Sequence, residues 1–303
     1  MISHIARAVV YYYKKCIVHI REDFSMKALS FNAYTLKWIA VIGMITNHVA
    51  IGLAPVLPLV PMLILYALGG LTYVIMAFFV VEGYKHTRSL GKYIGRLFLF
   101  GLIAQAFHPM VLGTTDIIGT GFFFNIMFTI ILALCVLYLY DKIKIRPLFW
   151  LIFVVACVVA MFMDLFFIGV LVPVLYYAIK KEGLRRTLPG IVSGTFFLLF
   201  GLLSGLPAIM YLLAGGQAPP ELATALYSAV EMSGMSVYMM AATPTFAIGA
   251  FLGAVLIRNY NGDRGRKSKW LFYVAYPVHL AIIAVIAVLA GVTEWNLFGF
   301  IQF

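Results

Sequence analysis

The chain has 303 residues, of which 64% are hydrophobic and only 11% are charged, and its mean hydropathy is +1.02. Soluble domains are about 45–50% apolar and about 25% charged, so the composition excludes an ordinary water-soluble protein. The formal net charge is +11, and the three cysteines (Cys16, Cys135 and Cys157) are scattered without a CxxC pair, which argues against a disulfide framework or a metal knuckle.

The predicted elements begin with an amphipathic helix at residues 3–23 that lies in the membrane interface. We therefore expect an interfacial N-terminal segment at 1–34 and a transmembrane domain at 35–303. Nine apolar runs follow, with lengths close to the ~20 residues of a membrane-spanning helix. They cover residues 35–54, 60–84, 92–110, 121–140, 147–163, 165–179, 188–205, 236–258 and 269–291. With a short apolar stretch at 206–215, expected to be re-entrant or on the surface, the predicted fold is an all-α polytopic bundle of about nine to ten transmembrane helices.

All 22 Lys and Arg residues fall on one side of this nine-span arrangement. They form five groups, within residues 1–37, 85–96, 142–146, 180–186 and 258–269. The positive-inside rule makes that side cytoplasmic, which predicts a multi-pass membrane protein with its N-terminus in the cytoplasm. Topogenic charge and contact with anionic lipid heads account for the net charge without a nucleic-acid partner.

Few polar groups lie inside the predicted spans, and ionisable groups at membrane depth are costly and usually functional. Lys37 and His48 are separated by three helical turns on one stripe of the first span, about 16 Å apart. His279 lies at a similar depth in the last span, so the two imidazoles could line one cavity beside Asn47. Two histidines without a third ligand predict no metal site. Each histidine could also simply bond a neighbouring helix.

Two acidic residues near the predicted membrane surfaces are harder to assign. Glu82 ends the second span, where it either takes part in chemistry or pairs with a nearby cation. Asp164, in the turn "MFMDLFF", is expected to be solvated on the outer side.

Several blocks of the sequence resemble one family. "NAYTLKWIAVIGMITNHVA" at 32–50 is similar to the first helix of TraX-type proteins, and Lys37-x10-His48 resembles the Arg-x10-His signature of the wider membrane acyltransferase superfamily that contains O-antigen acetylases. Lys replaces Arg here, and Asn47 stands where TraX-type sequences commonly have Asp. "FFVVEGYKHTRSLGKYIGRLFLFGLIAQ" at 78–105, "FNIMFTIILAL" at 124–134 and "LFYVAYPVHLAII" at 271–283 resemble the later blocks.

The resemblance implies an acetyl-CoA-dependent acyltransferase of the bacterial inner membrane, whose acceptor would be a peptide N-terminus or a glycan. TraX-type proteins acetylate the N-terminal amine of a pilin, and relatives in the wider superfamily acetylate sugars. The predicted catalytic set is His48, His279, Asn47 and Glu82, and the predicted cofactor-binding set is Lys37, Arg88, Arg96 and Tyr276.

The chemistry of these residues is compatible with that reaction. A neutral imidazole suits a general base, which is the role expected for His48. A basic inner face attracts polyphosphorylated compounds, so Lys37 at the mouth of the stripe would meet a phosphate of acetyl-CoA.

Two other classes of function stay open. Intramembrane histidines also occur in proton-coupled transporters or exporters, and a structural membrane subunit would leave these residues without a common task.

Overall fold

The structure is a computed structural model that describes residues 30–112, 123–217, 219–221, 223–224, 228, 237–267, 270–294, 296–297 and 301–302. The amphipathic helix predicted at 3–23 lies outside these residues. The elements are α2 (Ala33–Gly52), α3 (Leu59–His86), α4 (Leu90–Gln105), α5 (His108–Leu112), α6 (Ile126–Lys142), α7 (Arg146–Val159), η1 (Ala160–Phe162), α8 (Ile168–Ala178), α9 (Glu182–Leu213), α11 (Val237–Ala242), η2 (Thr243–Thr245), α12 (Phe246–Arg258), α13 (Leu271–Leu289), β1 (Asn296–Leu297) and β2 (Ile301–Gln302). The predicted all-α class is confirmed, with one short antiparallel pairing of β1 and β2 near the C-terminus.

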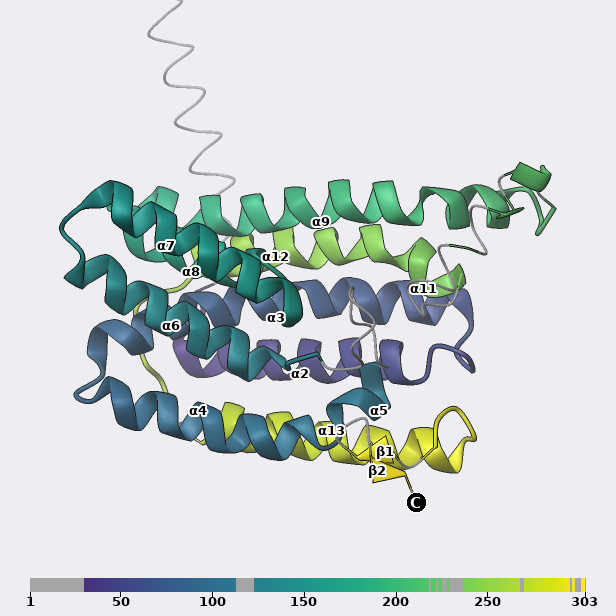
Figure 1. Cartoon of the computed structure of the whole chain (residues 1–303), viewed down its shortest axis with the longest axis horizontal. Helices are drawn as coiled ribbons and strands as arrows, with labels where there is room; N and C mark the ends of the chain where they lie inside the picture. Colours follow the sequence, from purple (N-terminus) through teal and green to yellow (C-terminus); the bar gives the residue numbers. More distant parts are fainter. Residues whose placement is uncertain are drawn as a thin grey trace, which may run out of the picture.

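The long helices lie side by side along the longest axis of the molecule (Figure 1). Helices α9, α12, α3 and α2 follow one another across the bundle, and α13 packs against both α2 and α4. Because α3 contacts helices on several sides, two thirds of its most apolar stretch is buried (67%). The most apolar stretch of α9 is only 22% buried, so α9 presents most of its apolar surface outward.

Glycine allows the closest helix crossing, between α3 and α12. A Cβ atom on Gly70 would collide with the backbone carbonyl oxygen of Phe246, and one on Gly249 with that of Ala67. Small residues at such crossings let two backbones approach, which is how helices associate inside membranes. The pairing of α3 with α12 therefore depends on these two glycines.

The number of spanning helices differs from the sequence prediction. Within the described residues, five helices are long and apolar enough to cross a membrane: Ala33–Gly52, Leu59–His86, Glu182–Leu213, Met240–Arg258 and Leu271–Leu289. This supports a membrane protein, but nine to ten spans are not confirmed. The stretch at 206–215 is not a separate re-entrant segment, because α9 runs without a break from Glu182 to Leu213.

The remaining predicted spans are short helices. Helix α6 has 17 residues and α8 has 11, which at 1.5 Å per residue cover about 25 and 16 Å of a hydrocarbon core of about 30 Å. Figure 1 shows α6 and α7 ending near the middle of the bundle's length. Sequence periodicity could not reveal this, because an apolar run predicts a buried helix as well as a spanning one.

A buried polar network fixes the point where α6 begins. Asn125 is fully buried and caps α6 by accepting a hydrogen bond from the backbone N–H of Met127. Its amide nitrogen donates to Gln105 Oε1 at 2.8 Å and to the carbonyl oxygen of Gly101 at 2.8 Å. Because buried amides are costly when unpaired, this network sets the register of α4 against α6. Beside it, Phe124 pairs with Met163 in an isolated β-bridge that ties the start of α6 to the turn before α8.

Candidate functional site

Two buried histidines meet at the centre of the bundle. His48 on α2 and His279 on α13 are 8% and 5% exposed. His48 Nδ1 lies 3.1 Å from His279 Nε2, and the ring centroids are 4.8 Å apart. The similar depth inferred from the sequence therefore corresponds to a direct contact. Their catalytic role stays a prediction.

The hydrogen bonds of the two rings select one tautomer. His279 Nδ1 lies 2.7 Å from the carbonyl oxygen of Ala275, which can only accept, so Nδ1 carries the proton and Nε2 is an acceptor. His48 Nδ1 lies 2.8 Å from the carbonyl oxygen of Met44, so it also carries its proton and shares it with His279 Nε2. His48 Nε2 is then the unprotonated nitrogen, and none of the described residues forms a hydrogen bond with it. This nitrogen can accept a proton or a hydrogen bond from a ligand.

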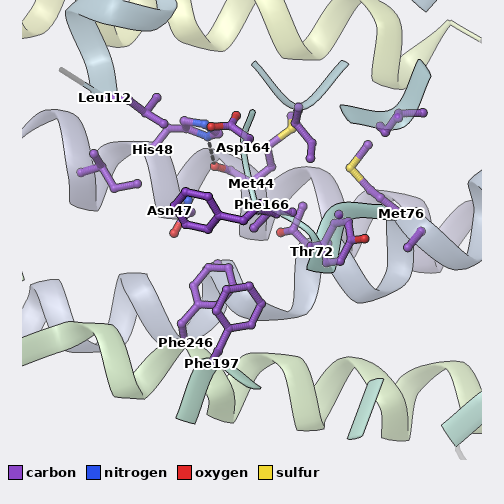
Figure 2. Close-up of a pocket in the computed structure, with 18 of the residues that line it drawn as sticks. Met44, Asn47, His48, Thr72, Met76, Leu112, Asp164, Phe166, Phe197 and Phe246 are labelled. Atoms are coloured by element: carbon purple, nitrogen blue, oxygen red, sulfur yellow. Dashed lines mark hydrogen bonds between the residues drawn. The ribbon is translucent and has the colours of Figure 1, made fainter. Parts of the chain in front are cut away.

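His48 lines a cavity of about 520 Å³, which we call the central pocket (Figure 2). Figure 2 shows Phe197 and Phe246 on one side of this cavity and His48 and Asp164 on the other. Most of the wall is apolar. Its volume falls in the range of about 300–1,000 Å³ that is typical of small-molecule sites.

Asn47 is the second predicted residue on the central pocket. It lines the pocket because it neighbours His48 on α2. Its Oδ1 atom is buried with no hydrogen-bond partner among the described residues. A carbonyl oxygen in that state costs free energy unless something bonds to it. Asn47 therefore contributes an unpaired polar group beside the pocket, and its oxygen packs against Gly69 of α3.

A second polar pair, which the sequence interpretation missed, lies near the first. Asp164 is not solvated on the outer side, as predicted, but lines the central pocket. Its Oδ2 atom lies 3.3 Å from Nε2 of His108, whose side chain is 1% exposed, while that of Asp164 is 14% exposed. The prediction was wrong because the Asp164 side chain turns inward, toward His108 and the central pocket, and is only 14% exposed. One sequence feature could have indicated this pair: His108 and Asp164 are each an isolated ionisable residue within an apolar stretch.

Tyr276 belongs to the histidine cluster and not to a phosphate site. Its ring centroid lies 6.0 Å from that of His48 and 5.5 Å from that of His279, and it lines the central pocket. Both rings meet it edge-on. The tyrosine thus confines the His48 ring from the α13 side.

The predicted basic groups gather around a different cavity, of about 730 Å³, which we call the basic pocket. Its cationic lining residues are Lys37, Arg96, Arg185, Arg186 and Arg264. Arg96 Nε is buried without a hydrogen-bond partner in the described part of the chain. Arg88 does not line this cavity. Lys37 and Arg96 are therefore placed to meet an anion, and Arg88 is not.

Glu82 lies at the basic pocket, apart from the histidines. Its Oε1 atom accepts from Arg185 at 2.8 Å and lies 3.4 Å from Lys85 Nζ. Glu182 pairs with Arg185 and Arg186 in the same network. The structure thus favours the structural alternative for Glu82, in which it holds α3 against α9. A catalytic role shared with His48 has no geometric support.

The two cavities adjoin each other. Met76, Val80 and Ile130 line both of them. Lys37 and His48 mark their two ends on α2, separated by about 16 Å of helix. One stripe of α2 therefore faces the basic pocket at its start and the central pocket near its end.

Comparison with known proteins agrees with part of the sequence interpretation. The model of the family described as "TraX protein" matches residues 32–287, well over half of the chain. A protein of Dichelobacter nodosus described as "Probable fimbrial assembly protein FimC, serogroup H1" is 27% identical over 280 residues, which cover 84% of this chain and 95% of that protein. No solved structure matches.

These findings correct the predicted function. The family match confirms the TraX part of the resemblance but shows no link to the acetyltransferase superfamily. The similar protein is named for fimbrial assembly. The prediction of an acetyl-CoA-dependent acyltransferase is therefore wrong, and the alternative of a proton-coupled transporter has no support either. The prediction rested on the resemblance of four sequence blocks, among them the one with Lys37-x10-His48, to that superfamily, and the comparisons extend the resemblance only to the TraX family.

Proposed function

Because the chain belongs to the TraX protein family, we propose that it acts in the processing or assembly of a fimbrial subunit at a membrane. The family match over residues 32–287 supports the proposal. The similarity to a fimbrial assembly protein over 95% of that protein's length supports it as well.

The observation that carries the proposal is His48 Nε2, an open imidazole nitrogen on the wall of an apolar cavity. A histidine that only held two helices together would have both nitrogens satisfied by protein groups. Here Nδ1 is held by Met44 and His279, so the ring is fixed and the other nitrogen is left for a partner. We infer that His48 accepts a proton or a hydrogen bond from the fimbrial subunit, which favours processing over a purely structural part in assembly.

The basic groups suggest an orientation and a second ligand. We propose that the end of the bundle that holds the basic pocket faces the cytoplasm of a bacterial inner membrane, since Lys and Arg concentrate on that side. Lys37, Arg96 and Arg264 line the pocket, and the unpaired Arg96 Nε suits an anion. A phosphate-bearing compound would match these groups. Acetyl-CoA, the ligand predicted from the sequence, is one such compound and stays a prediction.

The experiment is deletion of the gene in a fimbriate host. Surface fimbriae are counted by electron microscopy, and the intact mass of the fimbrial subunit is measured with and without the protein. Processing predicts few fimbriae and a shifted subunit mass, whereas assembly alone predicts few fimbriae and an unchanged mass. Normal fimbriae of unchanged subunit mass in the deletion strain would reject both forms of the proposal.

A further inference from the structure

Four aromatic rings separate the central pocket from the outer surface of α9. Phe166 and Phe167 come from the turn before α8, and Phe196 and Phe200 come from α9. The ring centroids of Phe166 and Phe200 are 6.3 Å apart, and those of Phe167 and Phe196 are 5.1 Å apart. All four line the pocket. We call them the aromatic mouth.

The mouth opens on an apolar surface. Among the described residues that line the pocket, Met161 and Phe200 are the exposed ones, at 39% and 41%. Neighbouring side chains on α7 and α9 are exposed and apolar as well, for example Val158 at 60% and Leu203 at 81%. In a membrane protein such a surface faces lipid, so the pocket approaches the bilayer at the mouth and at Met161.

With Arg186 at the membrane surface, as proposed above for the basic end of the bundle, the mouth lies near the middle of the membrane. Phe196 and Phe200 lie about 15 and 21 Å along α9 from Arg186, at 1.5 Å per residue. The hydrocarbon core is about 30 Å thick. At that depth the bilayer offers the ends of acyl chains and no headgroups. Whatever enters laterally there is a hydrocarbon chain and not a polar head.

The backbone at the mouth is strained. Leu165 and Phe166 have φ values of 67° and 49°, the only positive values at non-glycine residues in the described part of the chain. Such conformations cost roughly 1–3 kcal/mol each and persist only where surrounding structure imposes them. The backbone of Asp164 bonds to Phe124 at 3.0 Å, and its carbonyl oxygen accepts from Thr129 Oγ1 at 3.0 Å. These bonds anchor the turn that carries Phe166 against the start of α6.

We propose that the aromatic half of the central pocket, around Phe197 and Phe246, takes the end of an acyl chain of a bilayer lipid, which enters between Phe166 and Phe200. The headgroup stays in the membrane surface. The chain covers the apolar wall and keeps water away, while His48 on the other side stays uncovered for a polar partner (Figure 2). The inference rests on the cavity and the mouth, and it holds whether or not the protein acts on fimbriae.

The test uses the purified full chain in vesicles of phosphatidylcholine that carries a diazirine near the end of one acyl chain, with no fimbrial subunit present. After photolysis, mass spectrometry maps the labelled residues. We expect label on the pocket wall at Thr72 and Phe246, although these residues are only 9% and 8% exposed. Leu203, on the outer face of α9, is the control that must be labelled, and Leu36, fully buried away from the pocket, must stay unlabelled.

Two variants of one mouth residue make the test specific. Phe200→Ala widens the mouth and should increase the label at Phe246 relative to Leu203, whereas Phe200→Trp narrows it and should reduce that ratio. Phe200 is partly exposed, so neither change should unfold the protein. Label confined to outward-facing residues such as Leu203, or a ratio that neither variant changes, would overturn the inference and leave the role in fimbrial assembly untouched.

Discussion

His48 Nδ1 and His279 Nε2 lie 3.1 Å apart, although 231 residues separate them in the sequence. The contact fixes the His48 ring with its Nε2 atom available to the central pocket. In this arrangement His279 is a positioning residue that acts through His48. Its own Nδ1 is occupied by the carbonyl oxygen of Ala275.

The first prediction separates positioning from packing at His279. His279→Gln keeps an oxygen that can accept from His48 Nδ1, whereas His279→Leu keeps the volume without an acceptor. We expect the glutamine variant to preserve most of the fimbriation and subunit processing and the leucine variant to lose most of it. Counts of fimbriae and the processed fraction by intact mass measure both. Equal activity in the two variants, at equal protein levels, would mean that His279 only fills space.

The second prediction concerns the crossing of α3 and α12. Gly70→Leu places a side chain against the backbone carbonyl of Phe246, so the helices must separate. Overpacking of this kind costs about 1–3 kcal/mol or more. Thermal unfolding in detergent should show a lower Tm for Gly70→Leu than for Gly95→Leu, because a Cβ at Gly95 meets nothing within 4 Å. Equal Tm values would show that the crossing is looser than the structure has it.

The third prediction concerns His108 and Asp164. Their atoms lie 3.3 Å apart in a buried site, so the effects of His108→Gln and Asp164→Asn on stability should not add. A double-mutant cycle should give a coupling free energy of about 0.5–3 kcal/mol, as for residues within one polar network. Unfolding of the two single variants and the double variant supplies the values. Additive effects would show that the two side chains do not interact.

The fourth prediction concerns orientation in the membrane. In a chain with Cys16, Cys135 and Cys157 replaced by Ser, one new cysteine is placed at each end of the bundle. Lys144→Cys lies in the short connection between α6 and α7, and Ala214→Cys follows α9 at the opposite end. An impermeant maleimide added to whole cells should label position 214 and not 144. The reverse pattern would place the basic pocket on the outer side.

The sequence predicted the bundle better than its individual spans. Composition established the membrane class, and the matching depth of His48 and His279 pointed to their contact. Hydropathy could not distinguish the short helices α6 and α8 from full spans, since their length is limited by how α4, α6 and the turn at Asp164 pack together. The same reasoning explains the error at Asp164, because the sequence of a turn does not show whether its carboxylate points inward or outward.

The functional residues divide in a similar way. Lys37 and Arg96 both lie at the end of the bundle where the positive charges gather, and both line the basic pocket. Arg88 has the same charge and nearly the same sequence position, yet it does not line the basic pocket. Charge pattern alone cannot say which side of a helix a cation occupies. Glu82 shows the complementary case, since its partner Arg185 is 103 residues away and no local pattern links them.

The most direct test of the central claim is the intact mass of the fimbrial subunit from cells that carry His48→Gln. The claim is that His48 Nε2 acts on that subunit. Loss of such a group typically lowers a rate by about 10²–10⁴-fold. The account therefore predicts that the subunit mass from this variant equals the mass from the deletion strain and differs from that of cells with the unchanged protein or the surface control Lys144→Gln. A subunit fully processed by His48→Gln, at normal protein levels, would contradict it.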